Sequence, residues 1–412
     1  MSSTKDAQKL EAAPSRKPRH DSSGANVVEA AKKLGPVLRE RSAETTQLRR
    51  LPDASWEDLI DTGILRALQP ARWGGAEVHP NELFSAVIEI ARAEGSTGWV
   101  TGIIGVHPWH TALFANRAQE EMWRDEPAAM NSSSYAPTGK AERVSGGYRL
   151  SGRWSFSSGC DHCQWINLAA ISGTVSVEGN EMPDLRSFLL PRKDYKIDDN
   201  WFVAGLSGTG SKDILVDGAF VPEYRSLSHW DDKLGIELPG WELNTAPLYR
   251  LPWAVMFISG LASAALGASL GFLDTWTEIS RTRRAGFGGD ARDDPYTQQI
   301  AAEAGYTINT SILRLHRDCE EMMEMAHAGE PFSLKQRARF RYNAARSAQL
   351  AGRAVESLWE VSSGRKSFLD HPLQRRYQDI KTMLGHAGLN PKVPGKFLGA
   401  MELGNQVLNA IL

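Results

Sequence analysis

The sequence predicts an α+β protein in which a central block of strands separates two helical blocks. Three patterns carry this prediction: helical periodicity up to about residue 134, strand alternation from about 135 to 240, and long helical patterns after about 241. The first residues are polar and lack a continuous apolar run. We therefore expect a disordered tail at 1–25, a helical domain at 26–134, a β-domain at 135–240 and a helical bundle at 241–412.

The first helical block contains two recognisable helix starts. In "SWEDLIDTGIL", Ser55 is expected to be an N-cap, because acidic residues fill the first turn and apolar residues then recur at helical spacing. In "HPNELFSAVIEIARAEGSTGWVTGIIGVHPWH", Pro80 is expected at the first helical position, where a backbone N–H is not needed. The second stretch ends with His107 and His110, which lie one helical turn apart.

The middle block has the pattern of short strands bounded by turn residues. In "GGYRLSGRWSFSSG", alternation places Tyr148, Leu150, Trp154 and Phe156 on one face and Ser157 on the other. "QWINLAAI", "RSFLLP" and "DILVDGAFVP" predict further strands.

The last block predicts long helices at about Leu251–Arg283, Tyr296–His327 and Leu334–Val361, followed by a C-terminal group. The uncharged run Leu251–Leu273 is long enough to cross a membrane. It is rich in Ala, Gly and Ser, however, and its small residues recur every three or four positions, which makes a smooth face for another helix. We therefore expect a buried helix and no membrane span.

Composition indicates an ordinary globular protein, with 42% hydrophobic and 23% charged residues. The formal net charge is −2 and both signs are interspersed, so no basic surface is expected to attract nucleic acid or an anionic membrane. Three cysteines in 412 residues argue against a disulfide framework and favour a reducing compartment. A cytoplasmic location is expected.

The Cys-x-x-Cys spacing of "CDHC" suggests a metal or redox site. His316 and Cys319 would complete four ligands, but they lie in a predicted bundle helix, and nothing in the sequence brings them to Cys160. A thioredoxin-like motif opens a helix after a strand, whereas this one runs into a strand. Buried structural cysteines and no metal are expected.

Nucleotide and hydrolase motifs are missing from the sequence. "GLSGTGSKD" and "GFGGD" lack the Gly-x-Gly-x-x-Gly spacing and the βαβ context. There is no Walker lysine and no His-Glu-x-x-His helix. An oxidoreductase with this sequence would therefore have no nicotinamide site of its own.

The remaining candidates are polar residues at the ends of elements. Serines often cap and turn, and histidines often cap helices or fill core gaps, so each one has a structural explanation. What they share is a position at or near the end of a predicted helix or strand: His107, His110, Ser132, Ser133, Ser134, Ser157, Arg284 and His386.

Several stretches resemble acyl-CoA dehydrogenase-fold proteins over about residues 26–412. "GGYRLSGRWSFSSG" resembles their flavin-facing strand, "GLSGTGSKDILVDGAFVP" the end of their β-domain, and "RTRRAGFGG" their arginine-bearing helix end. "GSTGWVTGIIGVHPWHTALF", "SSSYAP" and "WSFSSGCDH" are similar to the oxygenase components of two-component flavin monooxygenases. The steroid-ring (secoandrostatriene) branch is the most similar, and the 4-hydroxyphenylacetate hydroxylase and indole monooxygenases are related. The resemblance implies an N-terminal helical domain, a central antiparallel β-barrel or sandwich, and a C-terminal four-helix bundle.

The C-terminal turn favours a monooxygenase over a dehydrogenase. Similar acyl-CoA dehydrogenases carry a catalytic glutamate there or on the long helix, whereas "GHAGLN" has His386 and no glutamate. A carboxylate suits removal of a proton alpha to a thioester, and an imidazole suits deprotonation of a phenol or activation of an indole. Two alternatives stay open: an FAD-dependent acyl-CoA dehydrogenase-type oxidoreductase, and a non-enzymatic or metal-stabilised helical protein.

The resemblance implies hydroxylation of a phenolic, indole or polycyclic aromatic substrate. The oxidant would be a C4a-hydroperoxyflavin formed from reduced flavin and O2. Reduced FAD is expected more than reduced FMN, as a diffusible co-substrate from a separate NAD(P)H:flavin reductase. Because the family is usually tetrameric, a homotetramer is expected.

The resemblance also assigns roles to individual residues. His386 is implied to be the base, with Ser157 near flavin N5 and C4a and His107 as a further catalytic residue. A helix-capping role for His386 is the alternative. The substrate is implied to contact His107, His110 and Ser132. The cofactor is implied to contact Trp154, Ser133, Ser157, Ser158, Ser363, Gly364 and Arg284, the last of these at the flavin phosphate across a subunit interface.

Overall fold

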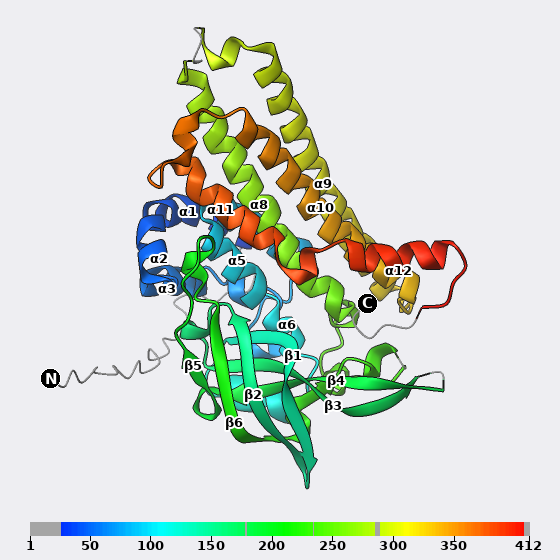
Figure 1. Cartoon of the computed structure of the whole chain (residues 1–412). Coiled ribbons are helices and arrows are strands. Elements are labelled where there is room, and N and C mark those ends of the chain that lie inside the picture. The colour runs from blue at the N-terminus through cyan, green and yellow to red at the C-terminus, as the bar shows by residue number, and fades with distance from the viewer. Residues whose placement is uncertain (1–25, 178, 234, 285–288, 408–412) are drawn as a thin grey trace, which may run out of the picture.

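The computed structural model describes residues 26–177, 179–233, 235–284 and 289–407, in which one sheet lies across one end of the long helices (Figure 1). Helices precede and follow the sheet in the chain. The predicted tail at 1–25 lies outside the described residues.

The helices before the sheet begin where the sequence predicts, with one exception. Pro80 is the first residue of its helix and His79 is the N-cap. Ser55 is not an N-cap, because Pro52 takes that position in an extended conformation and the Ser55 N–H donates to the Pro52 carbonyl at 3.0 Å. These helices are α1 (Val27–Glu40), α2 (Ser42–Leu48), α3 (Asp53–Asp61), α4 (Pro80–Ala93), α5 (Gly95–Ile104), α6 (His107–Thr111) and α7 (Asn116–Trp123).

The described strands form a single mixed sheet in the order β5-β6-β2-β1-β3-β4-β7. The prediction of an antiparallel sheet is wrong for one strand pair, because β3 pairs with β1 in parallel. After the β1–β2 hairpin the chain returns to the free edge of β1, so β3 must run in the direction of β1. The strands are β1 (Asn131–Val144), β2 (Gly147–Ser157), β3 (Trp165–Val177), β4 (Asn180–Pro191), β5 (Lys196–Asp198), β6 (Lys212–Pro222) and β7 (Ser226–Ser228).

A bulge interrupts the alternation at the end of β2. Tyr148, Leu150 and Trp154 are buried as predicted, but Phe156 is 69% exposed and has a φ of 66°. The β2–β6 register shifts between Trp154 and Ser157. An extra residue in a left-handed conformation therefore turns Phe156 outward, and the prediction that it shares the face of Trp154 was wrong.

The three long helices after the sheet agree with the predicted ranges to within two residues at each end. They are α8 (Trp253–Thr282), α9 (Pro295–His327) and α10 (Leu334–Glu360), and they are followed by α11 (Pro372–Leu384) and α12 (Lys392–Glu402). By length and composition α8 could cross a membrane, but 94% of its apolar window is buried within the protein. This burial confirms the prediction of a core helix.

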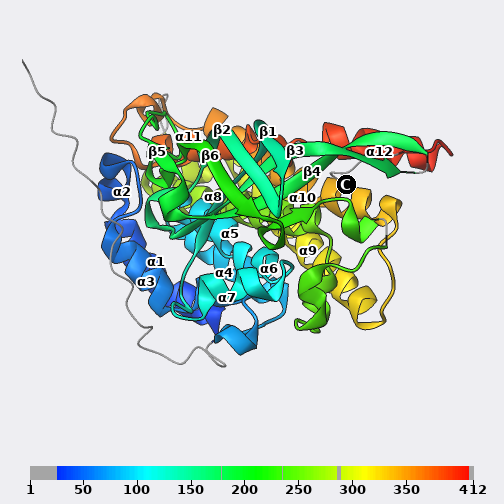
Figure 2. The ribbon, with the colours of Figure 1, turned by 90° about the horizontal axis from the view of Figure 1, so that it is seen from below.

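Glycines allow α8 to pack backbone to backbone on the preceding helices. A Cβ atom at Gly260 would lie 2.4 Å from the carbonyl oxygen of Gly102 in α5, and one at Gly267 would lie 2.2 Å from the carbonyl oxygen of Ile88 in α4. Seen from the sheet end, the strands lie across α5 and α8 (Figure 2). The start of α8, α5, α6 and the first strands therefore surround one junction.

Candidate active site

Two of the predicted hydroxyl groups meet at this junction. Ser157, at the end of β2, donates a hydrogen bond to Ser132 Oγ of β1 over 3.1 Å, and both side chains are fully buried. Ser158 belongs to a separate chain of hydroxyls, because its Oγ is 2.7 Å from Ser211 Oγ, which is 2.6 Å from Thr209 Oγ1. Ser157 is thus held by β1 and Ser158 by the loop before β6.

His107 and His110 are fully buried on α6. Neither ring nitrogen of His107 makes a hydrogen bond of ordinary geometry within the described chain, although the Asn131 backbone lies close by. His110 Nδ1 is 2.8 Å from the Tyr135 hydroxyl. Burial lowers the pKa of His107 to about 3 and the pKa of His110 well below its ordinary value. Both imidazoles are therefore neutral near pH 7.

His386 caps the short turn η12 (Ala387–Leu389) and not the helix before it. Its Nδ1 accepts a hydrogen bond from the Gly388 N–H at 3.0 Å, and its ring centroid is 5.6 Å from that of Trp99 in α5. The side chain is exposed, and the protein around the ring lowers its pKa below the ordinary value. A neutral ring whose Nδ1 accepts carries its proton on Nε2.

The cofactor role predicted for Trp154 does not fit its surroundings. Trp154 is fully buried in the core of the β-domain, where its indole N–H donates to the Ala169 carbonyl at 2.8 Å. The aromatic ring that remains accessible here is Phe156. Ser133 is buried, with 7% of its surface exposed, beside Tyr135 on β1.

Arg284, Ser363 and Gly364 lie at the far end of α8. Arg284 is exposed, forms a β-bridge with Asp290 and makes no ion pair within the described ranges. Ser363 and Gly364 lie at the start of η11 (Gly364–Ser367), next to Ser362, which accepts from the Trp276 indole. Ile258 on α8 faces Gly388, which lies next to His386, and Thr282 ends α8 just before Arg284. These two positions on α8 are 24 residues apart, so about 36 Å of helix separates His386 from Arg284, Ser363 and Gly364. A single chain therefore does not bring His386 together with these three residues.

The sequence analysis missed the side chains that pack around His107 and His110. The ring of Phe257 is 5.4 Å from His107, the ring of Trp253 is 4.9 Å from Tyr135, and His229 is 4.1 Å from Trp253. Asn167 on β3 lies beside the Tyr135 hydroxyl and belongs to the same group of side chains. The position of Asn167 between apolar residues in "WINLAAI" was the signal that could have found it.

The cysteines show no arrangement suited to metal or redox chemistry. Cys160, Cys163 and Cys319 are free and buried, and burial raises the pKa of each thiol. Within the described residues, no three His, Cys, Asp or Glu side chains are grouped to hold a metal ion.

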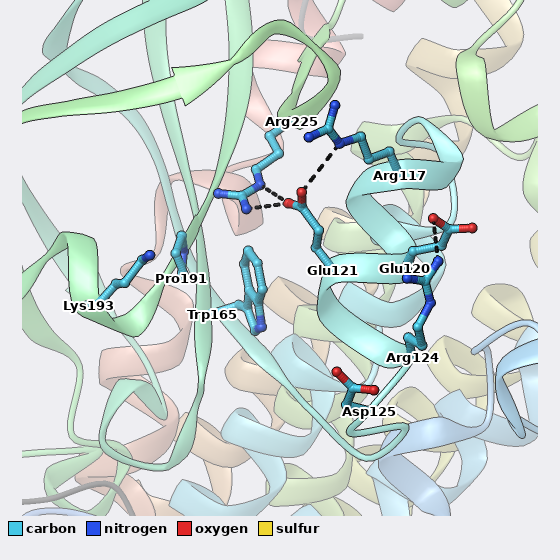
Figure 3. Close-up of a pocket in the computed structure, with 9 residues that line it drawn as sticks. All are labelled: Arg117, Glu120, Glu121, Arg124, Asp125, Trp165, Pro191, Lys193 and Arg225. Atoms are coloured by element: carbon cyan, nitrogen blue, oxygen red, sulfur yellow. Dashed lines mark hydrogen bonds and ion pairs between the residues drawn. The ribbon is translucent and has the colours of Figure 1, made fainter.

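A separate cavity of about 470 Å³ lies between α7 and the start of β3 (Figure 3). Its charges are largely paired: Arg124 contacts Glu120 at 2.8 Å, and both Arg117 and Arg225 contact Glu121. It contains none of the predicted site residues, so we do not assign the active site to it. The lining residues are Arg117, Glu120, Glu121, Arg124, Asp125, Trp165, Pro191, Lys193 and Arg225.

Comparisons with known proteins agree with this geometry. Residues 259–391 match the family described as acyl-CoA dehydrogenase, C-terminal domain. The chain is 40% identical over 381 residues to the flavin-dependent monooxygenase, oxygenase subunit HsaA, of Rhodococcus jostii strain RHA1, covering 92% of this chain and 98% of that protein. It is 32% identical over 380 residues to the FADH2-dependent resorcinol hydroxylase, oxygenase component, of a Rhizobium species, covering 90% and 92%.

A solved structure of a related protein has a similar fold. The crystal structure of 3-HSA hydroxylase from Rhodococcus sp. RHA1 matches with a TM-score of 0.87 at 38% identity, covering 94% of this chain and 99% of that one. The arrangement of sheet and helices is therefore that of an acyl-CoA dehydrogenase-fold protein. Within that class, the chain belongs to the oxygenase components of flavin-dependent monooxygenases. The predicted choice of monooxygenase over dehydrogenase is confirmed.

Proposed function

We propose that this oxygenase hydroxylates an aromatic substrate with O2 and reduced FAD delivered by a separate NAD(P)H:flavin reductase. The observation that carries the proposal is the buried junction between sheet and helices, where the Ser132–Ser157 hydroxyl pair lies on the sheet and the neutral His107 lies on α6. The names of the relatives, one of them an FADH2-dependent resorcinol hydroxylase, support this substrate class and favour reduced FAD over reduced FMN.

The residues present fit a flavin. Bound reduced flavin would supply the electrons that activate O2. Ser157 ends β2 with its hydroxyl bound to Ser132, Ser158 follows it with its hydroxyl bound to Ser211, and Ser133 is nearby on β1. Arg284 is an exposed cation without an ion pair in the described chain, which suits a phosphate. Because α8 separates these groups, Arg284, Ser363 and Gly364 would serve the flavin of a neighbouring subunit, which supports the expected homotetramer.

The histidines have different roles in proton transfer and substrate binding. In the tautomer fixed by Gly388, His386 presents an Nε2–H that donates a hydrogen bond to a substrate oxygen. To act as the predicted base, His386 must give up the Gly388 hydrogen bond. His107, whose ring nitrogens are both unbonded within the described chain, is the second candidate for the base. Ser132 and His110 would position the substrate oxygen beside it.

We further propose that residues 26–134, 135–240 and 241–412 are the three domains of this fold, with α8 to α11 as its four-helix bundle. In support, α8 contacts α9, α10 and α11.

Three free, buried cysteines support a reducing compartment such as the cytoplasm.

The test is reconstitution with a phenol as substrate. The purified chain with NADH alone should yield no hydroxylated product, and addition of a generic flavin reductase with FAD should yield it. Coupled NADH oxidation by the chain alone would contradict the proposal. Bleaching of bound FAD by an acyl thioester would instead favour the dehydrogenase.

A further inference from the structure

Buried polar atoms without hydrogen bonds gather around Tyr135. They are Nε2 of His110, Nδ2 of Asn131, both amide atoms of Asn167 and Nε1 of Trp253, each without a partner of ordinary geometry in the described part of the chain. We call His110, Asn131, Asn167 and Trp253 the polar cluster.

The fold brings the polar cluster together from β1, β3, α6 and α8. In the parallel β1–β3 register Asn167 lies opposite Ser133, so it shares the sheet face of Asn131 and Tyr135. Asn167 lies beside the Tyr135 hydroxyl, which is hydrogen-bonded to His110. The Trp253 ring centroid is 4.9 Å from that of Tyr135 and 5.9 Å from that of His110.

Such a concentration of unsatisfied groups is unusual in a folded protein, since nearly all buried polar groups have a partner. Two fully buried indoles show the contrast. The Trp154 N–H donates to the Ala169 carbonyl and the Trp109 N–H to the Leu248 carbonyl, both at 2.8 Å. The polar cluster therefore has the property of a site whose hydrogen bonds a ligand completes.

The imidazoles of His110 and His229, which lie in or beside the polar cluster, are neutral near pH 7. Burial lowers the pKa of His229, whose ring makes an edge-on contact with Trp253, to about 3. A narrow recess reaches His229 and Trp253 from the surface, and two cations line it. Both are engaged elsewhere: Lys233 Nζ lies 5.7 Å from the Trp230 ring centroid, and Arg337 Nε donates to the Phe332 carbonyl.

We propose that the polar cluster binds an uncharged oxygen of the aromatic substrate, a ketone or hydroxyl group remote from the ring position that reacts. Nδ2 of Asn167 and Nε1 of Trp253 donate to this oxygen, and Oδ1 of Asn167 accepts from it when it is a hydroxyl. Asn167 and Trp253 are then specificity-determining residues. The inference rests on the proposed function, because it takes the substrate to be aromatic and to lie against His107.

The test compares three phenols of similar size: 4-hydroxyphenylacetone, 4-isobutylphenol and 4-hydroxyphenylacetate. Their Kd values for the full chain are measured by calorimetry without flavin or turnover. The wild type should prefer the ketone to the carboxylate. Asn167→Leu should reduce the preference for the ketone over the isobutyl compound by about tenfold, the effect of one lost hydrogen bond to a buried group. Trp253→Phe, a smaller change, should reduce the same preference.

Thermal stability gives a second, independent readout. If Asn167 serves a ligand, Asn167→Leu should raise the Tm of the ligand-free chain, because it removes unsatisfied buried atoms. Trp154→Phe is the matched control: it removes a satisfied indole N–H, so it should lower the Tm and leave the ketone preference unchanged.

Three results would overturn the proposal: no ketone preference in the wild type, an unchanged preference in both variants, or a lower Tm for Asn167→Leu. Each would mean that water or a relaxed side chain satisfies these atoms. Failure of the proposed function looks different, since the ketone would then bind with the expected preference while no phenol is hydroxylated.

Discussion

Two buried polar regions of this molecule differ in whether their hydrogen bonds are complete. In the first, between α5, α11 and the loop at η5 (Ser207–Thr209), Glu94 accepts from two backbone N–H groups and Asp379 accepts from the Leu206 N–H at 2.6 Å. Arg376 donates to the Arg92 and Ala93 carbonyls, both at 3.1 Å. No buried atom of these three side chains lacks a partner within the described residues.

The second region, His107 together with the polar cluster, contains the unsatisfied atoms. The difference teaches that buried polarity serves two purposes in this fold. The satisfied region ties three elements together, so its loss should lower stability. The unsatisfied region is available to ligands, so its loss should lower activity and leave stability intact or improved.

The largest expected effect is a pH dependence in the first region. Burial, followed by the nearby Glu94, raises the pKa of Asp379 from 3.8 to about 7. Between these pH values the folded chain holds a proton that the unfolded chain releases, so this group's contribution to stability falls as pH rises from about 4 to 7. The fall should reach about 4 kcal/mol at 1.36 kcal/mol per pKa unit.

Asp379→Asn isolates that contribution, because its amide oxygen can still accept from Leu206. The difference in unfolding free energy between wild type and variant, measured by urea denaturation at several pH values, should shift in favour of the variant as pH rises. A constant difference would show that Asp379 is ionised throughout. The buried histidines act in the opposite direction, since their lowered pKa values cost stability as pH falls below about 6.5, but they cancel in the comparison.

The next effect concerns His386, which both caps η12 and faces the junction. His386→Ala and His386→Asn should each slow hydroxylation by about a hundredfold, because both lose the Nε2–H group. Only the alanine variant should also lose about 1 kcal/mol of stability, since asparagine retains an acceptor for Gly388. Rapid-mixing measurements of product formation report the catalytic role of His386, and thermal melts report its role as a cap. If His386→Asn hydroxylates at a near-normal rate, His386 serves only as the cap of η12 and His107 is the base.

The smallest effect distinguishes the neighbouring serines. Ser157→Ala should lower the hydroxylated product formed per reduced flavin oxidised by about tenfold, the effect of one buried hydrogen bond. Ser158→Ala, the matched control, breaks the chain to Ser211 and Thr209, so it should lower the Tm and leave coupling nearly unchanged. If Ser158→Ala lowers the coupling and Ser157→Ala does not, the flavin contact belongs to Ser158.

The sequence predicted the parts of this molecule that depend on local periodicity. The ranges of α8, α9 and α10 follow from apolar spacing, and the start of α4 follows from the fixed φ of Pro80. The bulge at Phe156 was not predictable from alternation, because it depends on one residue adopting a left-handed conformation. The polar cluster was not predictable either, since Asn131 and Asn167 share a sheet face only through a parallel register set by the return of the chain.

The glycine contacts between α8 and α5 have a consequence for altering the substrate range of this enzyme. Gly102 and Gly260 already lie at backbone contact distance, each with the other's carbonyl where a Cβ atom would stand. This wall of the junction cannot move inward, and a single added methyl group would push α8 outward along with Ile258 and the turn that carries His386. Variants with a new substrate range are therefore expected to come from side chains on the inner surface, such as Phe257, and not from shifts of the helices.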